Sequence, residues 1–463
     1  MKRCFLRGEE TLPTMSNDLN AFLFSTPDMT RVFSAEGQLR AMIRFEWALT
    51  RALESQKLAE PGSGTVLEGL LDAGFVDIDR LRNEARDDGN IAIPFVRQLT
   101  SAVSARNERA ACAIHLGATS QDVLDTALVL QMREGLALLE SAIATLDRAL
   151  VKLARTHRDT VMTGRTWLQA GPPTTFGLKI AGTIAALRRH RDRLRAAAER
   201  SLVMQFGGAV GTLAALHAAA GGVSGEFARL LQLPEPDLPW HSQRDRLVEI
   251  VEVLANLTGS LAKFARDIAL LMQTEVREVS EGGGENRGCS STMPHKHNPV
   301  SCAAVIAIHE RMPGLVGTML HAMPQEHERG PGMWQAEWET VPEAFRLSSA
   351  ALGYAIEIAE NLVVDADRMR ENLDALLGTG LAEAVSVALA PKLGRSAALD
   401  LLREASKRAT HQKHHLGDVL KSMPEVTAHL SGIEIERLMD PRAYLGSAER
   451  LIARILEKQD ADD

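Results

Sequence analysis

The densest group of chemically active side chains lies between Glu281 and Pro299. Three consecutive glycines, Gly282 to Gly284, are followed by clustered Ser, Lys and Asn residues just before a predicted helix. Glycine lets the backbone move, and the clustered side chains are of the types that transfer protons and bind carboxylates. A disordered linker does not require such a density of these groups, so the segment is predicted to be a catalytic lid that closes over a substrate.

Two further segments carry polar groups that suit a site, His115 to Asp122 and Gly164 to Pro173. In the first, Thr119 or Ser120 can cap a helix whose first turn contains an acidic residue. A helix N-terminus with two hydroxyl groups also suits a substrate carboxylate, although capping alone explains the same residues. The second segment has two prolines, a Trp and hydrogen-bonding side chains at a bend before a helix, where a plain turn is the simpler interpretation.

Long helices are predicted to hold these three segments. Aromatic residues make up only 4% of the 463 residues, whereas Ala, Leu, Arg and Glu are abundant, a composition that favours helices over strands. Apolar residues recur every three or four positions in several long segments. These cover residues 121–157, 175–200, 247–271, 305–319 and 343–362, with a further helix over 34–58.

The expected fold is all-α, with three helical domains and a central bundle of about five long helices. A leader of unknown role (residues 1–15) precedes an N-terminal helical domain (16–118), the central bundle (119–365) and a C-terminal helical cap (366–463). Long helices are stabilised mainly by packing along their length. Because the apolar stripes exceed what one chain can cover, the bundle is predicted to be shared between the subunits of an oligomer.

Composition argues against several classes of partner. The chain has 52 basic and 60 acidic residues, a formal net charge of −8, which does not favour nucleic acid. Its four cysteines lack CxxC spacing and are expected as free thiols in a reducing compartment. The uncharged segment 201–225 contains six glycines with Gln205 and His217, which predicts a loop and a buried helix rather than a membrane span. A soluble cytoplasmic protein without nucleic-acid or membrane partners is therefore expected.

A histidine cluster near the C-terminus is the one group that suggests a metal site. His411, His414 and His415 fall on a predicted helix of the cap, without a cysteine or acidic ligand at fitting spacing. A solvated helix face explains them better, so no metal site is predicted.

The three segments resemble the three signature regions of the fumarase/aspartase superfamily. Ser290 to Pro299 is similar to that superfamily's mobile Ser-Ser-x-Met-Pro-x-Lys-x-Asn loop, a highly specific motif. Within the superfamily the chain most resembles the bacterial 3-carboxy-cis,cis-muconate cycloisomerases, over residues 16 to about 456. The supporting segments are 115–133, 164–177, 205–216, 238–249 and 323–339.

This resemblance implies a homotetramer whose central bundle combines long helices from all four subunits. Each active site would combine the three signature regions from three different subunits. In the implied reaction a carboxylate of a muconate, a small di- or tricarboxylate, adds across the substrate's own double bond and closes a γ-lactone. The reaction belongs to the protocatechuate branch of aromatic degradation and uses no cofactor and no metal.

The resemblance also implies roles for individual residues. Ser290 would move the carbon-bound proton, with Lys296 favouring its alkoxide, and Ser291 is the weaker candidate for this base. Lys296 and Asn298 would hold a substrate carboxylate. The other residues assigned to the substrate pocket are Thr119, Ser120, Thr166, Trp167, Gln169, His241, Ser291, Met293 and Arg329. For Arg329, and for Arg244, the two interpretations are a second carboxylate anchor and a surface ion pair.

Two departures from the wider superfamily point to the subclass. Trp167 stands where most members have a histidine, and Ala303 stands where most have the glutamate that orients it. Amine and hydroxide leaving groups need a proton from a general acid. A carboxylate, with a reference pKa near ~4, can leave without one. The missing pair therefore argues against adenylosuccinate lyase, argininosuccinate lyase and fumarase activity.

Two further departures concern the cycloisomerase pattern, which usually has Gly and Arg where this chain has Cys289 and His297. Histidine is mostly neutral at pH 7 and has fewer donors than arginine. These changes leave open a related dianion such as 3-sulfomuconate as the substrate. Two more hypotheses are a fumarase-type elimination lyase, similar to adenylosuccinate lyase, and a helical structural protein without catalysis.

Overall fold

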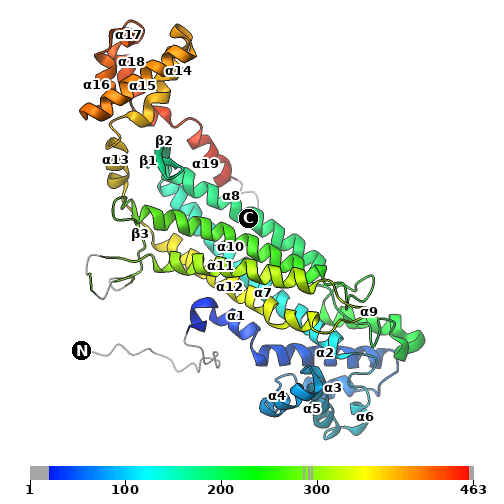
Figure 1. Ribbon diagram of the computed structural model, residues 1–463. Helices are drawn as coiled ribbons and strands as arrows, with labels where there is room; N and C mark the ends of the chain where they lie inside the picture. Colours follow the sequence, from blue (N-terminus) through cyan, green and yellow to red (C-terminus); the bar gives the residue numbers. More distant parts are fainter. Residues whose placement is uncertain (1–19, 285–286, 290–291, 294–295, 458–463) are drawn as a thin grey trace. The chain divides into compact units, whose positions relative to one another are not determined.

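The computed structural model describes residues 20–284, 287–289, 292–293 and 296–457, and these are mainly α-helical (Figure 1). Within that part of the chain, the strands form two two-stranded sheets, β1 with β2 and β3 with β4. The all-α fold class is therefore confirmed. The predicted leader, Ser290 and Ser291 lie outside the described residues.

Five long helices correspond to the five long periodic segments. They are α7 (Ser120–Thr156), α8 (Phe176–Ser201), α10 (Asp245–Leu271), α11 (Val300–Ala322) and α12 (Met333–Asn361). The largest difference is in α12, which starts well before the predicted position near 343. It continues through Pro342, a residue type that normally interrupts a helix because it lacks the backbone N–H.

The chain forms two compact units, and each of the five long helices has residues in both. The first unit holds the described residues up to 142, with 190–259 and 307–353; the second holds 143–189, 260–306 and those from 354. The division into three domains stays a prediction.

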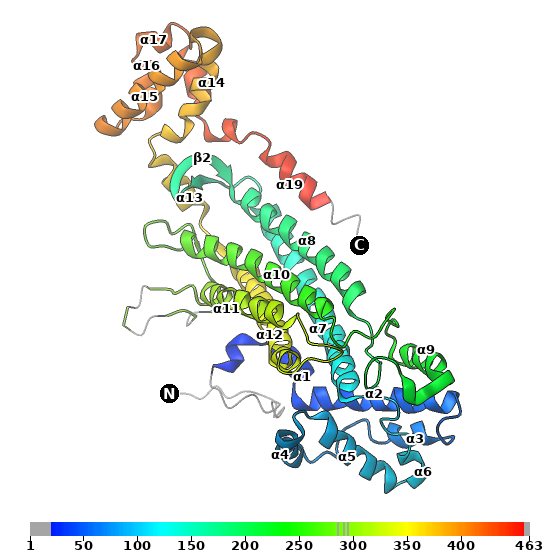
Figure 2. The same ribbon diagram turned by 45° about the vertical axis from the view of Figure 1, so that its right-hand side comes forward.

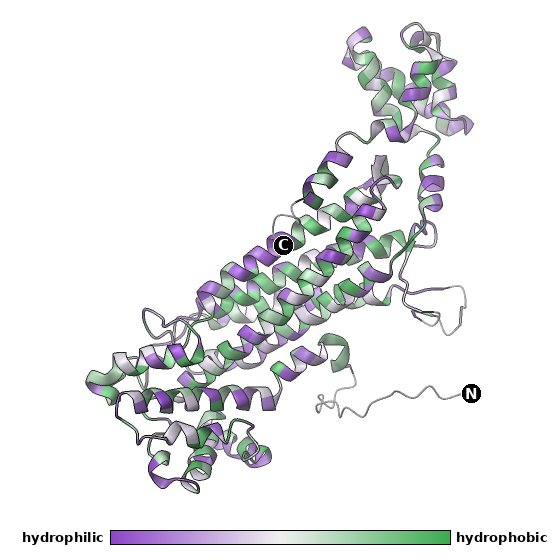
Figure 3. Ribbon diagram, turned by 180° about the vertical axis from the view of Figure 1, so that it is seen from behind, coloured by the Kyte–Doolittle hydropathy of each residue, from purple (hydrophilic) through white to green (hydrophobic). Residues whose placement is uncertain are grey.

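In the first unit, side-chain contacts join neighbouring long helices, which lie side by side in the two views (Figure 1, Figure 2). Arg195 of α8 bonds Glu140 of α7 at 2.6 Å, and Arg311 of α11 pairs with a glutamate of α12. In the second unit, Arg188 of α8 bonds Asp147 of α7 at 2.8 Å. Apolar and polar stretches alternate along these helices (Figure 3), as packing on one face and solvent on another require.

The remaining elements of the first unit are mostly short. They are η1 (Ala21–Phe24), α1 (Pro27–Val32), α2 (Ala35–Ser55), α3 (Ser63–Glu68), α4 (Ile78–Asp88), α5 (Ala92–Ser104), α6 (Glu108–Ala111), η2 (Ala214–Ala219) and α9 (Ala220–Leu231). Helix α2 confirms the helix predicted over 34–58, and the Ser34 hydroxyl caps it by accepting the Gly37 N–H at 3.0 Å.

The second unit contains both sheets and the C-terminal helices. The strands are β1 (Val161–Thr166), β2 (Gln169–Thr175), β3 (Val279–Ser280) and β4 (Val363–Val364). The helices are α13 (Ala366–Asp374), η3 (Thr379–Leu381), α14 (Ala382–Leu393), α15 (Arg395–Gln412), α16 (Leu416–Lys421), α17 (Pro424–Thr427), α18 (Gly432–Leu438), η4 (Pro441–Tyr444) and α19 (Ala448–Glu457). Val385, Leu402, Leu420 and Ile435 belong to a hydrophobic core that these helices build themselves.

His415 caps α16 in this region, since its ring Nδ1 accepts the Gly417 N–H at 3.2 Å. Among the described residues, no group of three or more His, Cys, Asp or Glu side chains is placed to hold a metal ion. In the same part of the chain, no single helix has the length and apolarity to cross a membrane. The bent pair Ala366–Asp374 and Thr379–Leu393, with 81° between them, meets those criteria only when the two are taken together.

Arg244 lies at the centre of a buried ion cluster in the first unit. Its guanidinium donates to Asp125 of α7 at 2.7 and 2.9 Å and to Glu337 of α12 at 3.0 and 3.1 Å. The side chain is almost fully buried. Both interpretations of Arg244 from the sequence, a substrate anchor and a surface ion pair, are therefore wrong. Burial and the neighbouring Asp125 raise the pKa of Glu337, although Arg244 opposes the shift.

Replacing Arg244 should destabilise the fold strongly. In Arg244→Met, two carboxylates stay buried without a cation, and the free energy of unfolding should fall by about 3–5 kcal/mol, measured by urea denaturation. The matched control is Arg229→Met, which removes an exposed pair with Glu226 and should leave the midpoint unchanged. Equal midpoints for the two variants would show that the cluster does not stabilise the protein.

Candidate active site

The start of α7 presents two hydroxyl groups, as the first of the polar segments predicted. Thr119 immediately precedes the helix and Ser120 is its first residue. The Thr119 N–H donates to the Asp122 carboxylate at 3.0 Å, so this acidic residue satisfies a backbone donor at the helix start. Within the described part of the chain, neither hydroxyl makes a hydrogen bond. Both are therefore available to a ligand.

Asp122 is fully buried and receives several hydrogen bonds. Its carboxylate accepts from the Gly207 N–H at 3.0 Å, the Gly208 N–H at 2.9 Å and His241 Nε2 at 2.7 Å. Gly208 has a φ of +67°, and a Cβ there would lie 2.8 Å from the carbonyl oxygen of Gly117. His241 is 4% exposed, so in this structure it shapes the site through Asp122. Its predicted contact with substrate stays a prediction.

Arg329 is half-buried beside the same segments. Its Nε donates to Gln121 Oε1 at 3.0 Å and its Nη2 to the Ala209 carbonyl at 3.1 Å. Among the described residues it forms no ion pair, which removes the surface ion pair as an interpretation. A partly desolvated guanidinium held by neutral oxygens is suited to binding an anion.

His115 is tied to Glu46 of α2, a contact that the sequence analysis did not predict. The Glu46 carboxylate is fully buried and accepts from the His115 N–H at 2.9 Å, and it lies 2.7 Å from ring Nδ1. Burial disfavours the imidazolium, but Glu46, with a smaller contribution from Asp122, outweighs it and raises the pKa of His115. No local pattern could have identified Glu46, because 69 residues separate the partners.

In the second unit, the bend predicted over 164–173 is a β-hairpin. Thr166 pairs with Gln169 across β1 and β2, and the two residues of the turn, Trp167 and Leu168, have φ of +53° and +61°. Such turns normally contain Asn or Gly, because other residues are strained there. Trp167 is 97% exposed and Leu168 78%. A strained turn that exposes two large apolar side chains is typical of a functional contact.

The hairpin is held next to its tip by another buried acid. Glu278 is fully buried and accepts from Arg165 Nη1 and from Asn372 Nδ2, both at 2.9 Å. Arg165 directly precedes Thr166, so this ion pair sets the position of the residues at the tip. No local pattern identifies the role of Arg165, because Glu278 lies 113 residues away in the chain.

Both ends of the predicted lid (residues 281–299) are anchored in the second unit. The Glu281 carboxylate accepts the N–H groups of Ser301 and Cys302 at 3.0 and 2.8 Å, which satisfies the start of α11. Arg287 pairs with Glu357 of α12. Burial, together with Glu281, raises the pKa of the Cys302 thiol, so this cysteine is not a nucleophile at neutral pH.

The two arms of the lid meet at Gly288 and Asn298. The Gly288 carbonyl accepts the Asn298 N–H at 2.8 Å and its side-chain Nδ2 at 3.0 Å. A Cβ on Gly288 would lie 2.4 Å from the Asn298 carbonyl oxygen, so only glycine fits. Lys296 is exposed. Cys289 and His297, the two departures from the cycloisomerase pattern, are directly opposite each other in an antiparallel bridge.

Met293 is 42% exposed in the lid, whereas Ser290 and Ser291, the predicted proton-transfer residue and the weaker candidate for that role, lie outside the described residues. The structure therefore describes the lid's anchors and its Lys296, and the roles of the two serines stay predictions.

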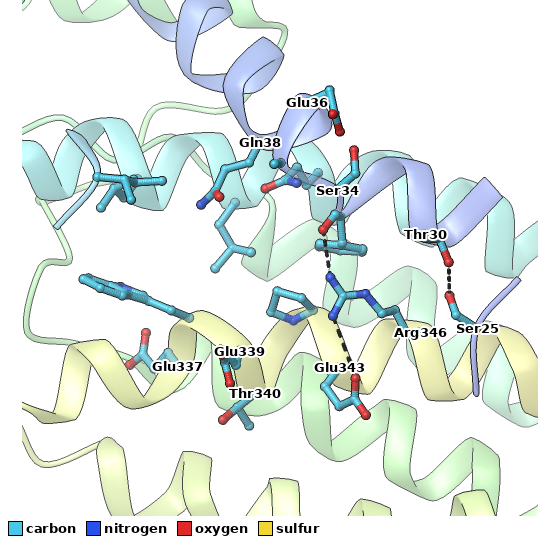
Figure 4. Close-up of a pocket in the computed structure, with 18 of the residues that line it drawn as sticks. Ser25, Thr30, Ser34, Glu36, Gln38, Glu337, Glu339, Thr340, Glu343 and Arg346 are labelled. Carbon is cyan, nitrogen blue, oxygen red and sulfur yellow. Dashed lines mark hydrogen bonds and ion pairs between the residues drawn. The ribbon is translucent and has the colours of Figure 1, made fainter. Parts of the chain in front are cut away.

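A cavity of about 1330 Å³ lies elsewhere in the first unit, between α1, α2, α7, α11 and α12 (Figure 4). None of the predicted site residues lines it. Its acidic groups, which include Glu36, Glu339 and Glu343, outnumber its basic ones, and Arg346 donates to the Phe33 carbonyl at 2.8 Å. An acidic cavity repels a polycarboxylate, so we do not place the chemistry there.

The comparisons with known proteins agree on one family. A model described as "Lyase" matches residues 26–314, and one described as "Adenylosuccinate lyase C-terminus" matches 378–455. The chain is 48% identical to a 3-carboxy-cis,cis-muconate cycloisomerase of Pseudomonas aeruginosa, over 96% of this chain and 97% of that protein.

Two solved structures are similar to this chain over nearly its whole length. A 3-carboxy-cis,cis-muconate lactonizing enzyme from Pseudomonas putida has a TM-score of 0.91 at 47% identity, with 96% of this chain and 99% of that one covered. A β-carboxy-cis,cis-muconate cycloisomerase from Acinetobacter calcoaceticus has a TM-score of 0.90 at 37% identity, with 95% and 100% covered.

The raised pKa of His115 predicts a pH-dependent part of the stability. The contribution should be fully present below the unfolded-state pKa of about 6.5 and lost as pH rises through the higher folded-state pKa. Glu46→Gln removes the carboxylate and should flatten this dependence, measured as urea midpoints between about pH 6 and 9. Glu108→Gln, at an exposed position, should behave as wild type. Parallel profiles for wild type and Glu46→Gln would contradict the assignment.

Proposed function

The chain belongs to the fumarase/aspartase superfamily of lyases, and from that premise we propose that it lactonises 3-carboxy-cis,cis-muconate to a 4-carboxymuconolactone. The observation that carries the proposal is the near full-length similarity to relatives with this named activity. The pathway would be the protocatechuate, or β-ketoadipate, branch of aromatic degradation.

The proposed reaction is intramolecular and involves no net gain or loss of electrons by the substrate. A carboxylate oxygen of the substrate bonds to one carbon of a double bond, and the π electrons move to the neighbouring carbon, α to a second carboxylate. The resulting aci-carboxylate carries extra negative charge, which cationic and N–H groups must stabilise. A proton then bonds to that carbon. The carbon that gains oxygen is oxidised by as much as the carbon that gains the proton is reduced, so the molecule undergoes no net redox change. Because no group leaves either, the reaction requires neither a redox cofactor nor an activated leaving group.

The residues of this chain can divide these tasks. Ser290 would deliver the proton to carbon, with Lys296 stabilising its alkoxide, and Arg329 would hold a substrate carboxylate with the Thr119 and Ser120 hydroxyls. Arg329 suits this role because it forms no ion pair within the described part of the chain. Trp167 would cover the substrate. It stands at the position where most members of the superfamily have a histidine, and poorer leaving groups need a proton from a general acid.

A second candidate is a cycloisomerase of 3-sulfomuconate. The bridge between Cys289 and His297 favours it, since both departures from the pattern fall on one pair of facing positions in the lid. A fumarase-type elimination lyase is a third candidate, and the histidine–glutamate pair replaced by Trp167 and Ala303 weighs against it.

We also propose a cytoplasmic homotetramer whose sites combine segments from three subunits. The nearly complete exposure of Trp167 and Leu168 supports this assembly, because a strained apolar turn gains most when another surface covers it. The cytoplasmic location rests on the proposed catabolic role and on the described cysteines, Cys112, Cys289 and Cys302, which form no disulfide with one another.

Purified protein should consume 3-carboxy-cis,cis-muconate, followed as loss of its ultraviolet absorbance. Ser290→Ala should lower kcat by about 10²–10⁴-fold, the usual contribution of a proton-transfer group. Ser104→Ala, at an exposed position of α5, should retain full activity. Faster turnover of 3-sulfomuconate would favour the second candidate, and release of fumarate from succinyl substrates would favour the elimination lyase.

The shared site predicts complementation between inactive variants. Light scattering should give four times the mass of one chain. Trp167→Ala and Lys296→Ala should each be nearly inactive, whereas tetramers reassembled from a mixture of the two should regain part of the activity. A fully active monomer, or a mixture no more active than its components, would rule out a site shared between subunits.

A further inference from the structure

The geometry around Arg329 points to Gln121 as the positioning residue that aims this guanidinium at a substrate carboxylate. The inference deepens the proposed function and rests on it. Gln121 is fully buried in the first turn of α7, so it acts on the substrate only through Arg329.

Two hydrogen bonds set the orientation of the Gln121 amide. The His241 carbonyl oxygen lies 2.8 Å from one amide atom of Gln121, and Arg329 Nε lies 3.0 Å from the other. A carbonyl only accepts and a guanidinium only donates. The amide nitrogen must therefore face His241 and the amide oxygen must face Arg329. A flipped amide would lose both bonds, so the assignment follows from the partners.

The same contacts determine which donors of Arg329 remain. Nε is used by Gln121, and Nη2 is used by the Ala209 carbonyl at 3.1 Å and approaches that of Gly208 at 3.5 Å. Nη1 has no partner within the described residues. Gln121 and the 208–209 backbone thus hold one edge of the planar guanidinium, which directs the remaining donors to an incoming anion.

The backbone that shares this task is itself fixed from α7. Asp122, the residue after Gln121, accepts the N–H groups of Gly207 and Gly208 and the ring of His241. Two adjacent residues of one helical turn therefore position Arg329. Gln121 bonds to it directly, and Asp122 acts through the glycine segment whose carbonyl groups face it. A buried amide contributes no charge, so the guanidinium keeps its full attraction for a carboxylate.

A double-mutant cycle tests the inference. Gln121→Met keeps the side-chain length and removes the acceptor, and kcat/KM for 3-carboxy-cis,cis-muconate should fall about 10–100-fold, mainly through KM, as expected for loss of a hydrogen bond to a charged group. In an Arg329→Ala background the same change should have almost no further effect, since Gln121 acts through Arg329. Gln121→Glu, which pairs Arg329 with a competing carboxylate, should also raise KM.

The chain offers a matched control in Gln131. It is a second buried glutamine of α7, 5% exposed, and donates to the Val32 carbonyl at 2.7 Å without touching Arg329. Gln131→Met should lower stability and leave KM unchanged. Additive effects in the cycle, or an equal rise of KM in Gln131→Met, would overturn the inference.

A binding measurement separates this inference from the proposed function. Tricarballylate, a tricarboxylate probe, should raise the melting temperature of wild type and Gln131→Met, and the shift should be reduced in Gln121→Met as in Arg329→Ala. If no muconate is turned over but this pattern holds, the proposed function fails and the positioning role stands. If muconate is turned over and Gln121→Met retains the full shift, only the positioning role fails.

Discussion

The buried carboxylate of Asp122 is the group on which the first unit's site depends. A buried charge is costly unless donors surround it, and Asp122 receives the N–H groups of Thr119, Gly207 and Gly208 together with the ring of His241. Three of these donors are backbone groups, so one side chain joins the start of α7 to a glycine segment distant in the chain. The positions of the hydroxyls on α7 and of Arg329 follow from that connection.

In the second unit, acidic side chains also accept several hydrogen bonds and join distant segments, at two places. Glu278 holds the hairpin next to its tip through Arg165, and Glu281 fixes the end of the lid through the N–H groups that open α11. In each case a buried or half-buried acid is satisfied by groups next to a predicted functional segment. These contacts leave the Trp167 turn and Lys296 in the lid exposed, as their proposed roles require.

Charge explains why these segments suit a polycarboxylate. Arg329 keeps its charge uncompensated within the described part of the chain, whereas Glu46 balances any charge that His115 gains from their pairing. The large cavity in the first unit has the opposite character and an excess of acidic groups. A carboxylate nucleophile needs no base to activate it, and a leaving carboxylate needs no acid to protonate it. This agrees with a tryptophan at the hairpin tip in place of the histidine that most members of the superfamily have.

Much of the fold was readable from periodicity, because long amphipathic helices repeat one local rule. The start of α12 was missed because Pro342 lies inside the helix, and the hairpin was missed because a turn of Trp167 and Leu168 breaks the usual composition of such turns. The buried status of Arg244 was also unreadable, since its partners lie 119 and 93 residues away.

The sequence by itself determined the helical class, the three polar segments and the family, because each is encoded within a short window, whereas the roles of individual reacting side chains stay predictions. Only the tertiary structure decided which acids are buried, which donors satisfy them, and that Gln121 presents its oxygen to Arg329. Burial and hydrogen-bond partners depend on residues brought together from distant parts of the chain, and no local sequence pattern predicts those contacts.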